Sequence, residues 1–280
     1  MRRAAPWVAV ALLACAPAMA AQQVPAELAR EREEYGRWLA TAPSSPYAAL
    51  ALVPVGPRVT IGDGDTDAPI PGVPAATITQ RGGTLTLEAA GTTKPLPRGR
   101  LVPHGASHRL LASGAPGRAT VSVFGPVRAA RPPSYFPYQG DAAFRVTLVP
   151  LDAPRAVALL GPDGQETRGA DVGSAHGTFR GRPLRLTVRR LPGATPDESE
   201  LEVFFRDRTS GKTTYDGGRF VTLLPAEDGT YVLDFNRARN PFCAYSSVFP
   251  CPAPWPNNTL DVEVNAGERY ERKPVEAPGT

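Results

Sequence analysis

Residues Ala143–Val149 read AFRVTLV, an alternation of apolar and polar side chains. A period of two is typical of a strand that buries one face and exposes the other. Comparable short runs occur along most of the chain, separated by turn sequences such as Arg81-Gly82-Gly83 and Gly161-Pro162-Asp163-Gly164. No βαβ rhythm is present, so a parallel α/β fold is disfavoured. We expect a mainly β protein with antiparallel, sandwich-like or barrel-like sheets.

The composition agrees with many short strands joined by turns. Of 280 residues, 27 are Gly and 32 are Pro, while 42% are hydrophobic. Disorder is therefore disfavoured, and the length allows one large β domain or two subdomains. The proline-rich run VRAARPPSYFPY marks the expected boundary between them. The expected divisions are a signal peptide at 1–20, an N-terminal helix at 21–41, a β subdomain at 42–126, a connector at 127–138, a C-terminal β subdomain at 139–272 and a tail at 273–280.

The expected helix has its clearest pattern at Pro25–Leu39, PAELAREREEYGRWL. Leu28, Tyr35 and Trp38 fall on one face at helical spacing, and charged residues at 30–34 cover the other face. We expect this helix to pack on the outside of the β core.

The first twenty residues have the features of an export signal. Two arginines and the apolar run Ala4–Ala14 precede Ala18-Met19-Ala20, a small-x-small cleavage sequence. Cleavage there would deliver the protein to the periplasm or the medium. In an alternative interpretation, Leu12-Leu13-Ala14-Cys15 is a lipobox, and a lipid on Cys15 would anchor the chain to a membrane.

Charge and motifs disfavour several classes of function. The chain has 31 basic and 27 acidic residues, and removing 1–20 would leave a net charge of about +2. No Lys/Arg stripe is present, so we expect no nucleic-acid partner. No Walker A motif or G-x-G-x-x-G after a strand is present, so we expect no nucleotide cofactor.

The three histidines and the acidic run give little support for a metal or a catalytic triad. Asp63-x-Asp65-x-Asp67 lacks the bidentate acid of a calcium loop, and Pro103 and Gly105 break any helix between His104 and His108. His176 lies in GSAHG, which we interpret as a turn, and no G-x-S-x-G motif occurs. We therefore expect no metal site and no Ser-His-Asp hydrolase.

One stretch near the C-terminus, DFNRARNPFCAYSSVFPCP at 234–252, is unusual in composition. Its polar residues and an upstream hairpin contain a carboxylate, amides and arginines that could bind a polar ligand or orient a water molecule. The same side chains could instead shape loops and lock the core. The candidate ligand-binding residues are Arg206, Asp207, Tyr215, Arg219, Asp234, Asn236 and Asn240.

Cys243 and Cys251 are the two cysteines that would remain after cleavage of the signal. In an oxidising compartment we expect them to form a disulfide. A metal site with two thiolates or a redox pair are the alternatives, although further ligands and the C-x-x-C spacing are lacking.

The C-terminal half contains a set of motifs that belong together: Phe205-Arg-Asp207-x-Thr209-x-Gly211, Thr214-Tyr215, Gly218-Arg-Phe220, Leu233-Asp-Phe-Asn236-x-Ala238, Asn240-Pro241, Cys243-Ala-Tyr245, Cys251-Pro252, Asn258 and Ala266-Gly-Glu268. Weaker landmarks upstream are Ser45-Pro46, Tyr135-Phe-Pro137 and Phe144-Arg-Val146. With these motifs the chain resembles a bacterial family known as domain of unknown function 1684, over roughly residues 27–272. The resemblance implies no activity, because the family has none assigned.

Three functional hypotheses remain open from the sequence. The first is an exported envelope protein that binds a small polar molecule or an envelope polymer in a pocket of the C-terminal half. The second is a hydrolase with Asp234 or Asp207 as its base. The third is a structural or interaction protein in which the 234–252 stretch only braces the fold.

Overall fold

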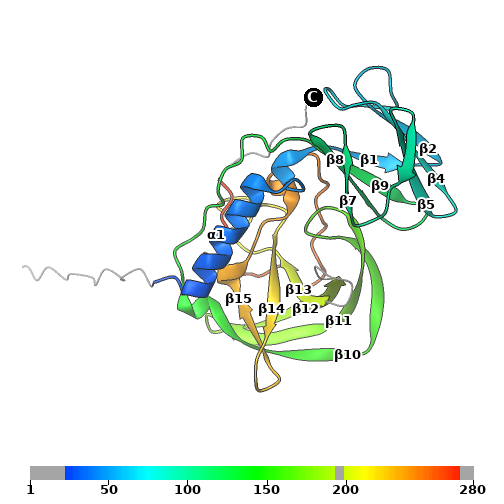
Figure 1. Ribbon diagram of the computed structural model, residues 1–280. Coiled ribbons are helices and arrows are strands. Elements are labelled where there is room, and N and C mark those ends of the chain that lie inside the picture. The colour runs from blue at the N-terminus through cyan, green and yellow to red at the C-terminus, as the bar shows by residue number, and fades with distance from the viewer. Residues whose placement is uncertain (1–22, 193–198, 272–280) are drawn as a thin grey trace, which may run out of the picture.

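The computed structural model describes residues 23–192 and 199–271. The expected signal peptide at 1–20 and tail at 273–280 lie outside these ranges. Within them the fold is mainly β, with antiparallel sheets and an N-terminal helix, α1 (Ala26–Thr41), as the sequence predicted (Figure 1). Short 3-10 helices lie at Pro46–Ala48 (η1), Gly140–Ala142 (η2), Phe235–Arg237 (η3) and Phe242–Ala244 (η4).

The first nine strands form two sheets that pack face to face as a sandwich. One sheet has the order β1-β9-β8-β7 and the other β3-β2-β4-β5-β6. Apolar residues of both sheets, such as Val121 and Ile78, form one buried cluster between them. The strands are β1 (Ala49–Val55), β2 (Arg58–Gly62), β3 (Ala68–Pro69), β4 (Ala76–Arg81), β5 (Thr84–Ala89), β6 (Thr92–Pro95), β7 (Leu101–His104), β8 (His108–Ser113) and β9 (Ala119–Phe124).

The remaining six strands form a closed antiparallel barrel. Each strand pairs with the next, and the pairing of Ala143 with Asp234 closes the barrel between its first and last strands. Ala175, Leu186 and Val203 fill its interior. The strands are β10 (Ala143–Leu160), β11 (Glu166–Phe179), β12 (Arg182–Pro192), β13 (Ser199–Phe205), β14 (Arg219–Pro225) and β15 (Tyr231–Asp234).

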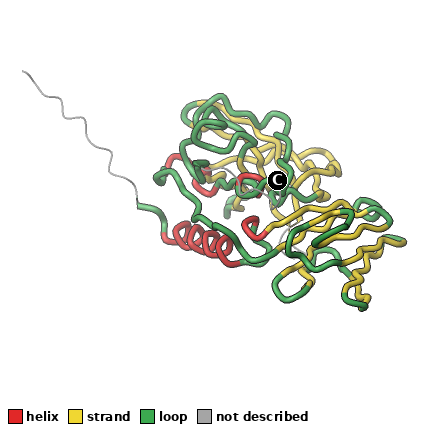
Figure 2. Tube along the Cα trace, turned by 90° about the horizontal axis from the view of Figure 1, so that it is seen from above, coloured by secondary structure: helices red, strands yellow, loops and turns green. Residues whose placement is uncertain are grey.

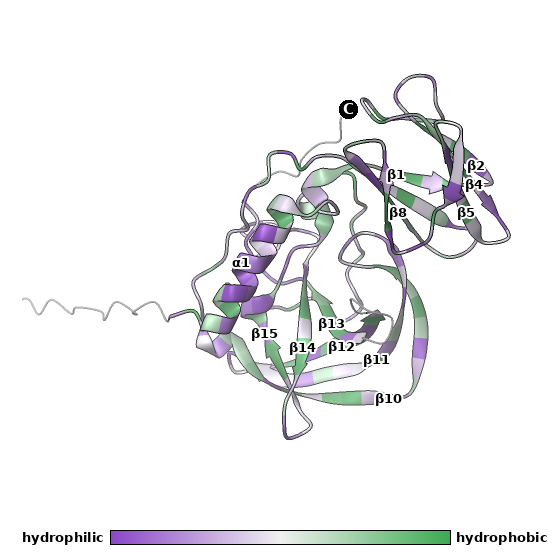
Figure 3. Ribbon diagram, in the orientation of Figure 1, coloured by the Kyte–Doolittle hydropathy of each residue, from purple (hydrophilic) through white to green (hydrophobic). Residues whose placement is uncertain are grey.

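Helix α1 lies along the outside of the barrel (Figure 1). Its Leu28 and Leu39 are buried, and it carries both apolar and hydrophilic residues, seen as green and purple in Figure 3. Arg32 Nη2 donates to the carbonyl of Asn236 at 3.0 Å, which fastens the helix to the segment after β15. In the part of the chain that the structure describes, no helix combines the length and apolar character needed to cross a bilayer.

The stretch 234–252 lies where the sandwich meets the barrel, which are seen side by side in Figure 2. Phe249 and Cys243 pack with Phe124 and Ala49 of the sandwich. The Phe242 amide donates to the carbonyl of Pro162 in the β10–β11 turn at 2.8 Å. The stretch 234–252 therefore contacts both the sandwich and the barrel and holds them together.

Three details differ from the sequence-based expectation. Ala143–Val149, which the alternation predicts as a strand, is only the first part of β10; the strand continues past Pro150, which lies beside a break in the pairing with β11. His176 lies in strand β11 and not in a turn. Residues Thr259–Val264, whose LDVEV alternation also predicts a strand, form no regular strand; Thr259 makes one isolated bridge, to Arg206.

Candidate functional site

Two of the candidate residues, Asp207 and Arg219, form a buried ion pair. Arg219 Nη2 lies 3.0 Å from Asp207 Oδ2, and both side chains are 1% exposed. The guanidinium also donates to the carbonyls of Ala266 and Val264, at 2.5 and 3.0 Å. Asp207 Oδ1 accepts from the backbone N–H of Thr209 at 2.7 Å. The pair therefore ties the C-terminal segment to the barrel and offers no free group to a ligand.

Asp234 and Asn236 form a second closed network. Asp234 Oδ1 accepts from the backbone N–H of Asn236 at 2.9 Å and from its side-chain amide at 2.8 Å, which caps η3. The Asn236 side chain also accepts from the Gln139 N–H at 3.0 Å and donates to the Gln139 carbonyl at 2.8 Å. Asn236 is fully buried, so this network joins the loop before β10 to the end of β15.

Of the other candidates, only Asn240 lines the large polar cleft described next. Arg206 pairs at the surface with Asp216, at 2.6 Å. The Tyr215 hydroxyl contacts Cys243 Sγ at 3.2 Å and Cys251 Sγ at 2.9 Å. The seven predicted residues thus form separate networks and do not converge on one pocket.

A polar cleft of about 440 Å³ lies between α1 and the outer face of β13 and β14. Val203 and Val221 point into the barrel core, so their neighbours Glu202 and Thr222, which pair across the two strands, face the cleft. The wall residues are Glu31, Tyr35, Pro162, Glu200, Glu202, Phe220, Val221, Thr222, Leu224, Arg237, Arg239, Asn240 and Phe242.

Glu202 is the most perturbed acid of the cleft. It is 6% exposed, and Thr222 Oγ1 donates to its Oε1 at 2.6 Å. Its Oε2 receives no hydrogen bond from any residue that the structure describes. Burial first, and then the charge of Glu200 and a hydrogen bond shared with its side chain, raise the pKa of Glu202 to about 8, although Thr222 and Arg239 act in the opposite direction. At neutral pH this carboxyl group is mostly protonated and can donate a hydrogen bond.

Arg239 and Asn240 supply complementary groups. The Arg239 guanidinium lies over the Tyr35 ring, 4.6 Å from its centroid, and forms no ion pair with a residue in 23–192 or 199–271. Asn240 is 4% exposed, and its Oδ1 is buried without a donor from the described residues. The cleft wall therefore carries a cation, with a neutral carboxyl group and an amide oxygen buried directly behind its surface.

A buried network behind the cleft fixes Tyr35 and Asn240. Tyr35 donates to the Tyr245 hydroxyl at 3.3 Å, and Tyr245 in turn donates to Glu268. Glu268 Oε2 accepts from the backbone N–H of Asn240 at 2.9 Å. Burial first, and then the Glu268 charge, raise the pKa of Tyr35, so its hydroxyl stays protonated. Wall groups held by such a network are preorganised for binding.

The cleft continues along α1. A second hollow of about 240 Å³ shares Glu31, Tyr35 and Arg239 with it and reaches Trp38. The Trp38 and Phe242 rings lie 5.7 Å apart at this end. An aromatic rim beside polar groups is typical of sites for small polar ligands.

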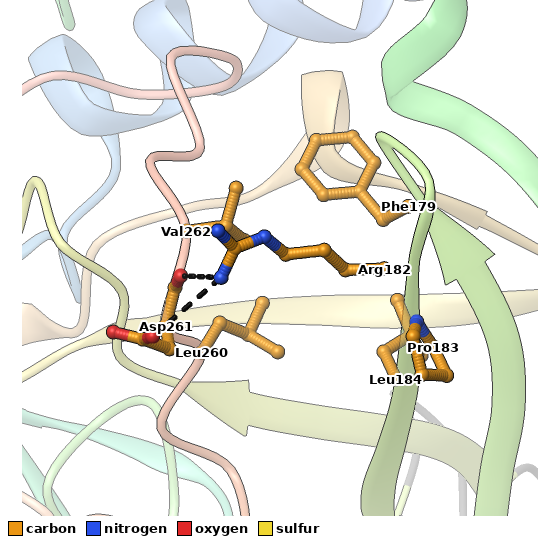
Figure 4. Close-up of a pocket in the computed structure, with 7 residues that line it drawn as sticks. All are labelled: Phe179, Arg182, Pro183, Leu184, Leu260, Asp261 and Val262. Atoms are coloured by element: carbon orange, nitrogen blue, oxygen red, sulfur yellow. Dashed lines mark hydrogen bonds and ion pairs between the residues drawn. The ribbon is translucent and has the colours of Figure 1, made fainter.

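Another hollow lies elsewhere on the barrel, under Arg182 and Leu260 (Figure 4). Its volume is about 370 Å³ and most of its lining is apolar. The polar partners drawn there, Arg182 and Asp261, already interact at 3.5 Å. Among the described residues, no group of three or more His, Cys, Asp or Glu is placed to hold a metal ion.

The structure shows no disulfide between Cys243 and Cys251: both are free thiols, the first buried and the second exposed. The shared Tyr215 hydroxyl bonds to both sulfur atoms instead. Burial raises the pKa of Cys243 to about 12, so this thiol is unreactive while it remains in place.

Sequence reasoning missed Glu202 and Arg239. A glutamate at a polar position of a strand normally faces solvent, and here it is covered by tertiary packing, to which α1 and the segment after β15 both contribute. The one available signal was period two: Glu200 and Glu202 had to share a face of their strand.

The fold and the site define a β protein in which a barrel carries a polar cleft beneath an N-terminal helix. A family model described as "Protein of unknown function (DUF1684)" matches residues 133–269, a shorter span than the sequence suggested. The chain belongs to this family. It is similar to an uncharacterized protein of Haloarcula marismortui solved by solution NMR, at 38% identity over 50% of this chain and 76% of that one, with a TM-score of 0.43. No curated protein matches the chain.

Proposed function

We propose that this protein binds a small polar ligand in the cleft between α1 and strands β13 and β14. The observation that carries the proposal is the Arg239 guanidinium in the cleft wall, which has no carboxylate partner among the described residues, next to two buried polar atoms without partners there, Glu202 Oε2 and Asn240 Oδ1. Buried polar groups without partners are costly, and functional sites are where proteins retain them. A ligand that supplied the partners would recover this cost.

The wall groups favour a ligand with a negatively charged group and a hydrogen-bond donor. Arg239 would pair with the negative group, because its guanidinium has no carboxylate partner among the described residues. Protonated Glu202 would donate to a ligand oxygen, and Asn240 Oδ1 would accept from a ligand hydroxyl or amine. The size of the cleft, about 440 Å³, suits a small molecule, or the end of an envelope polymer that extends toward Trp38.

The Asp-dependent hydrolase loses its support. Asp207 is saturated by Arg219 and Thr209, and Asp234 by Asn236. A general base must reach a water molecule or a substrate proton, and neither carboxylate lines the cleft.

A thermal-shift screen of amino acids, hydroxy acids and sugars at pH 6.5, followed by calorimetric titration of the hits, tests the proposal. Arg239→Ala should weaken binding of a hit by about tenfold or more, the value of one charge-assisted hydrogen bond. Arg100→Ala, on an exposed arginine of the sandwich, is the matched control. Hits that bind wild type and Arg239→Ala equally well would refute the proposal.

We also propose export of the protein, on the basis of the signal-like residues 1–20, and oxidation of Cys243 and Cys251 after export. Contact of both sulfur atoms with one hydroxyl supports their pairing. A nine-residue loop closed in this way would stabilise the protein by about 2.5 kcal/mol in the chain-entropy model. Protein recovered from the periplasm, unfolded without reductant, should give no reaction with a thiol reagent. Two reactive thiols per mature chain would contradict this.

A further inference from the structure

Strand β11 brings a serine and a histidine together on the outside of the barrel, on a different wall from the cleft. Ser174 and His176 are two residues apart and share a face, while Ala175 between them is buried in the barrel core. Ser174 Oγ lies 2.8 Å from His176 Nε2. This is the separation of a nucleophile from its general base.

A β-bulge builds a hollow beside this pair. Asp171 and Ser174 are three residues apart, so in a regular strand they would face opposite sides. The pairing with β12 shifts register between Asp171 and Gly173, and the pairing with β10 shifts at the same place. This extra residue lets both side chains line one hollow of about 140 Å³, together with Arg155 and Arg185. Ser174 is only 9% exposed, but it borders this space.

The hollow is positively charged. Asp171 is held by Arg155 at 2.5 Å and Arg189 at 2.6 Å. Arg185 lies opposite His176 across the β11–β12 pairing and forms no ion pair with a residue that the structure describes. Its guanidinium is therefore available to a negative group next to the serine. A developing oxyanion or a substrate carboxylate would meet it there.

An apolar surface borders the same place. Val149 lies opposite Ser174 across the β10–β11 pairing. Val149 and Leu151, at 44% and 45% exposed, are the large hydrophobic side chains that the described structure leaves most open to solvent. Leu151 also lines the hollow. Ser174 thus lies between a cation and an apolar patch.

We propose that Ser174 is a nucleophile activated by His176, at a second site that cleaves small carboxylic esters carrying an anionic group. His176 carries its proton on Nδ1 and takes the Ser174 proton on Nε2 while Oγ bonds to the ester carbon. The tetrahedral oxyanion collapses, the carbon–oxygen bond to the alcohol breaks, and the alcohol leaves with the proton from Nε2. Water then attacks the acyl-serine with His176 as base, which releases the carboxylic acid and restores Ser174.

Labelling of the folded full-length protein with a fluorophosphonate tests the nucleophile directly. Ser174 Oγ should displace fluoride, and peptide mass spectrometry should place the adduct on the peptide that contains Ser174. Thr178→Ala, an exposed change in the same strand, should label like wild type. His176→Gln should label at least tenfold more slowly while its unfolding curve stays unchanged. Absence of an adduct, or an adduct on another residue, would overturn the proposal.

Turnover tests the substrate class. Hydrolysis of 4-nitrophenyl hydrogen succinate should exceed that of the neutral 4-nitrophenyl butyrate, and Ser174→Ala should remove at least nine-tenths of the rate. Arg185→Gln should slow hydrolysis of the anionic ester at least tenfold more than hydrolysis of the butyrate ester, and so abolish the preference for the anionic ester. Equal hydrolysis by wild type and Ser174→Ala would exclude a nucleophilic role for this serine.

Discussion

Replacing Asp207 by alanine should lower the free energy of unfolding by about 3–5 kcal/mol at pH 7, the typical cost of removing one partner of a buried ion pair. The change leaves the Arg219 guanidinium, with a side chain that is 1% exposed, without its carboxylate. Burial lowers the pKa of Arg219, and the charge of Asp207 opposes this effect. The Asp207 carboxylate therefore stabilises the charged guanidinium in the core. Urea denaturation followed by circular dichroism gives the difference.

The matched control is Asp216→Ala, which removes the exposed partner of Arg206. Surface pairs contribute between about 0 and 1 kcal/mol, so this variant should unfold close to wild type. The double variant Asp207→Ala, Arg219→Met should recover part of the loss, because no unpaired charge stays buried. A single Asp207→Ala variant that lost less than about 1 kcal/mol would contradict the structural role of the pair.

Glu202→Gln should make the protein more stable at alkaline pH, by roughly 4–5 kcal/mol at pH 9, and by only about 1 kcal/mol at pH 5. The pKa of Glu202 is about 8 in the folded protein and has its ordinary value of 4.5 in the unfolded chain. Between these values the folded state binds the extra proton, so wild-type stability falls as pH rises through this window. Glutamine has no proton to lose and avoids this fall.

Urea denaturation at pH 5, 7 and 9 measures the effect, with Glu88→Gln on an exposed position of β5 as control. The control should follow the wild-type pH dependence. Curves for Glu202→Gln that run parallel to wild type from pH 5 to pH 9 would show that the carboxyl group is not held protonated. Since the protonated group is the proposed donor to the ligand, that result would also weaken the binding proposal.

The sequence pattern predicted the class of fold because the apolar residues that repeat with strand or helix spacing are also the residues that the fold buries. Period two gave strands such as Ala143–Val149, the first part of β10, and the helical spacing of Leu28, Tyr35 and Trp38 gave α1. Closure of the barrel could not be predicted from local sequence, because it depends on the pairing of Ala143 with Asp234, which are far apart in the chain. Pro150 also misled the strand assignment, because a bulge permits a proline that a regular ladder would exclude.

The candidate site was less predictable for a physical reason. The polar residues of 205–219 and 234–240 stood out by type, but most of them satisfy one another inside the fold. Asp207 binds Arg219, and Asn236 binds Gln139. The cleft is made by tertiary packing, which buries Glu202 beneath α1 and leaves Arg239 without a carboxylate. No local signal separates such a glutamate from a solvated one.

The central claim, that the cleft between α1 and the barrel binds a polar ligand, is tested most directly by a crystal structure with a screening hit bound. The account predicts ligand density between Tyr35 and β14, with a negative group of the ligand within hydrogen-bond distance of Arg239 and an oxygen facing Glu202. Density in the mostly apolar hollow under Arg182 and Leu260, with the cleft left empty, would contradict the account.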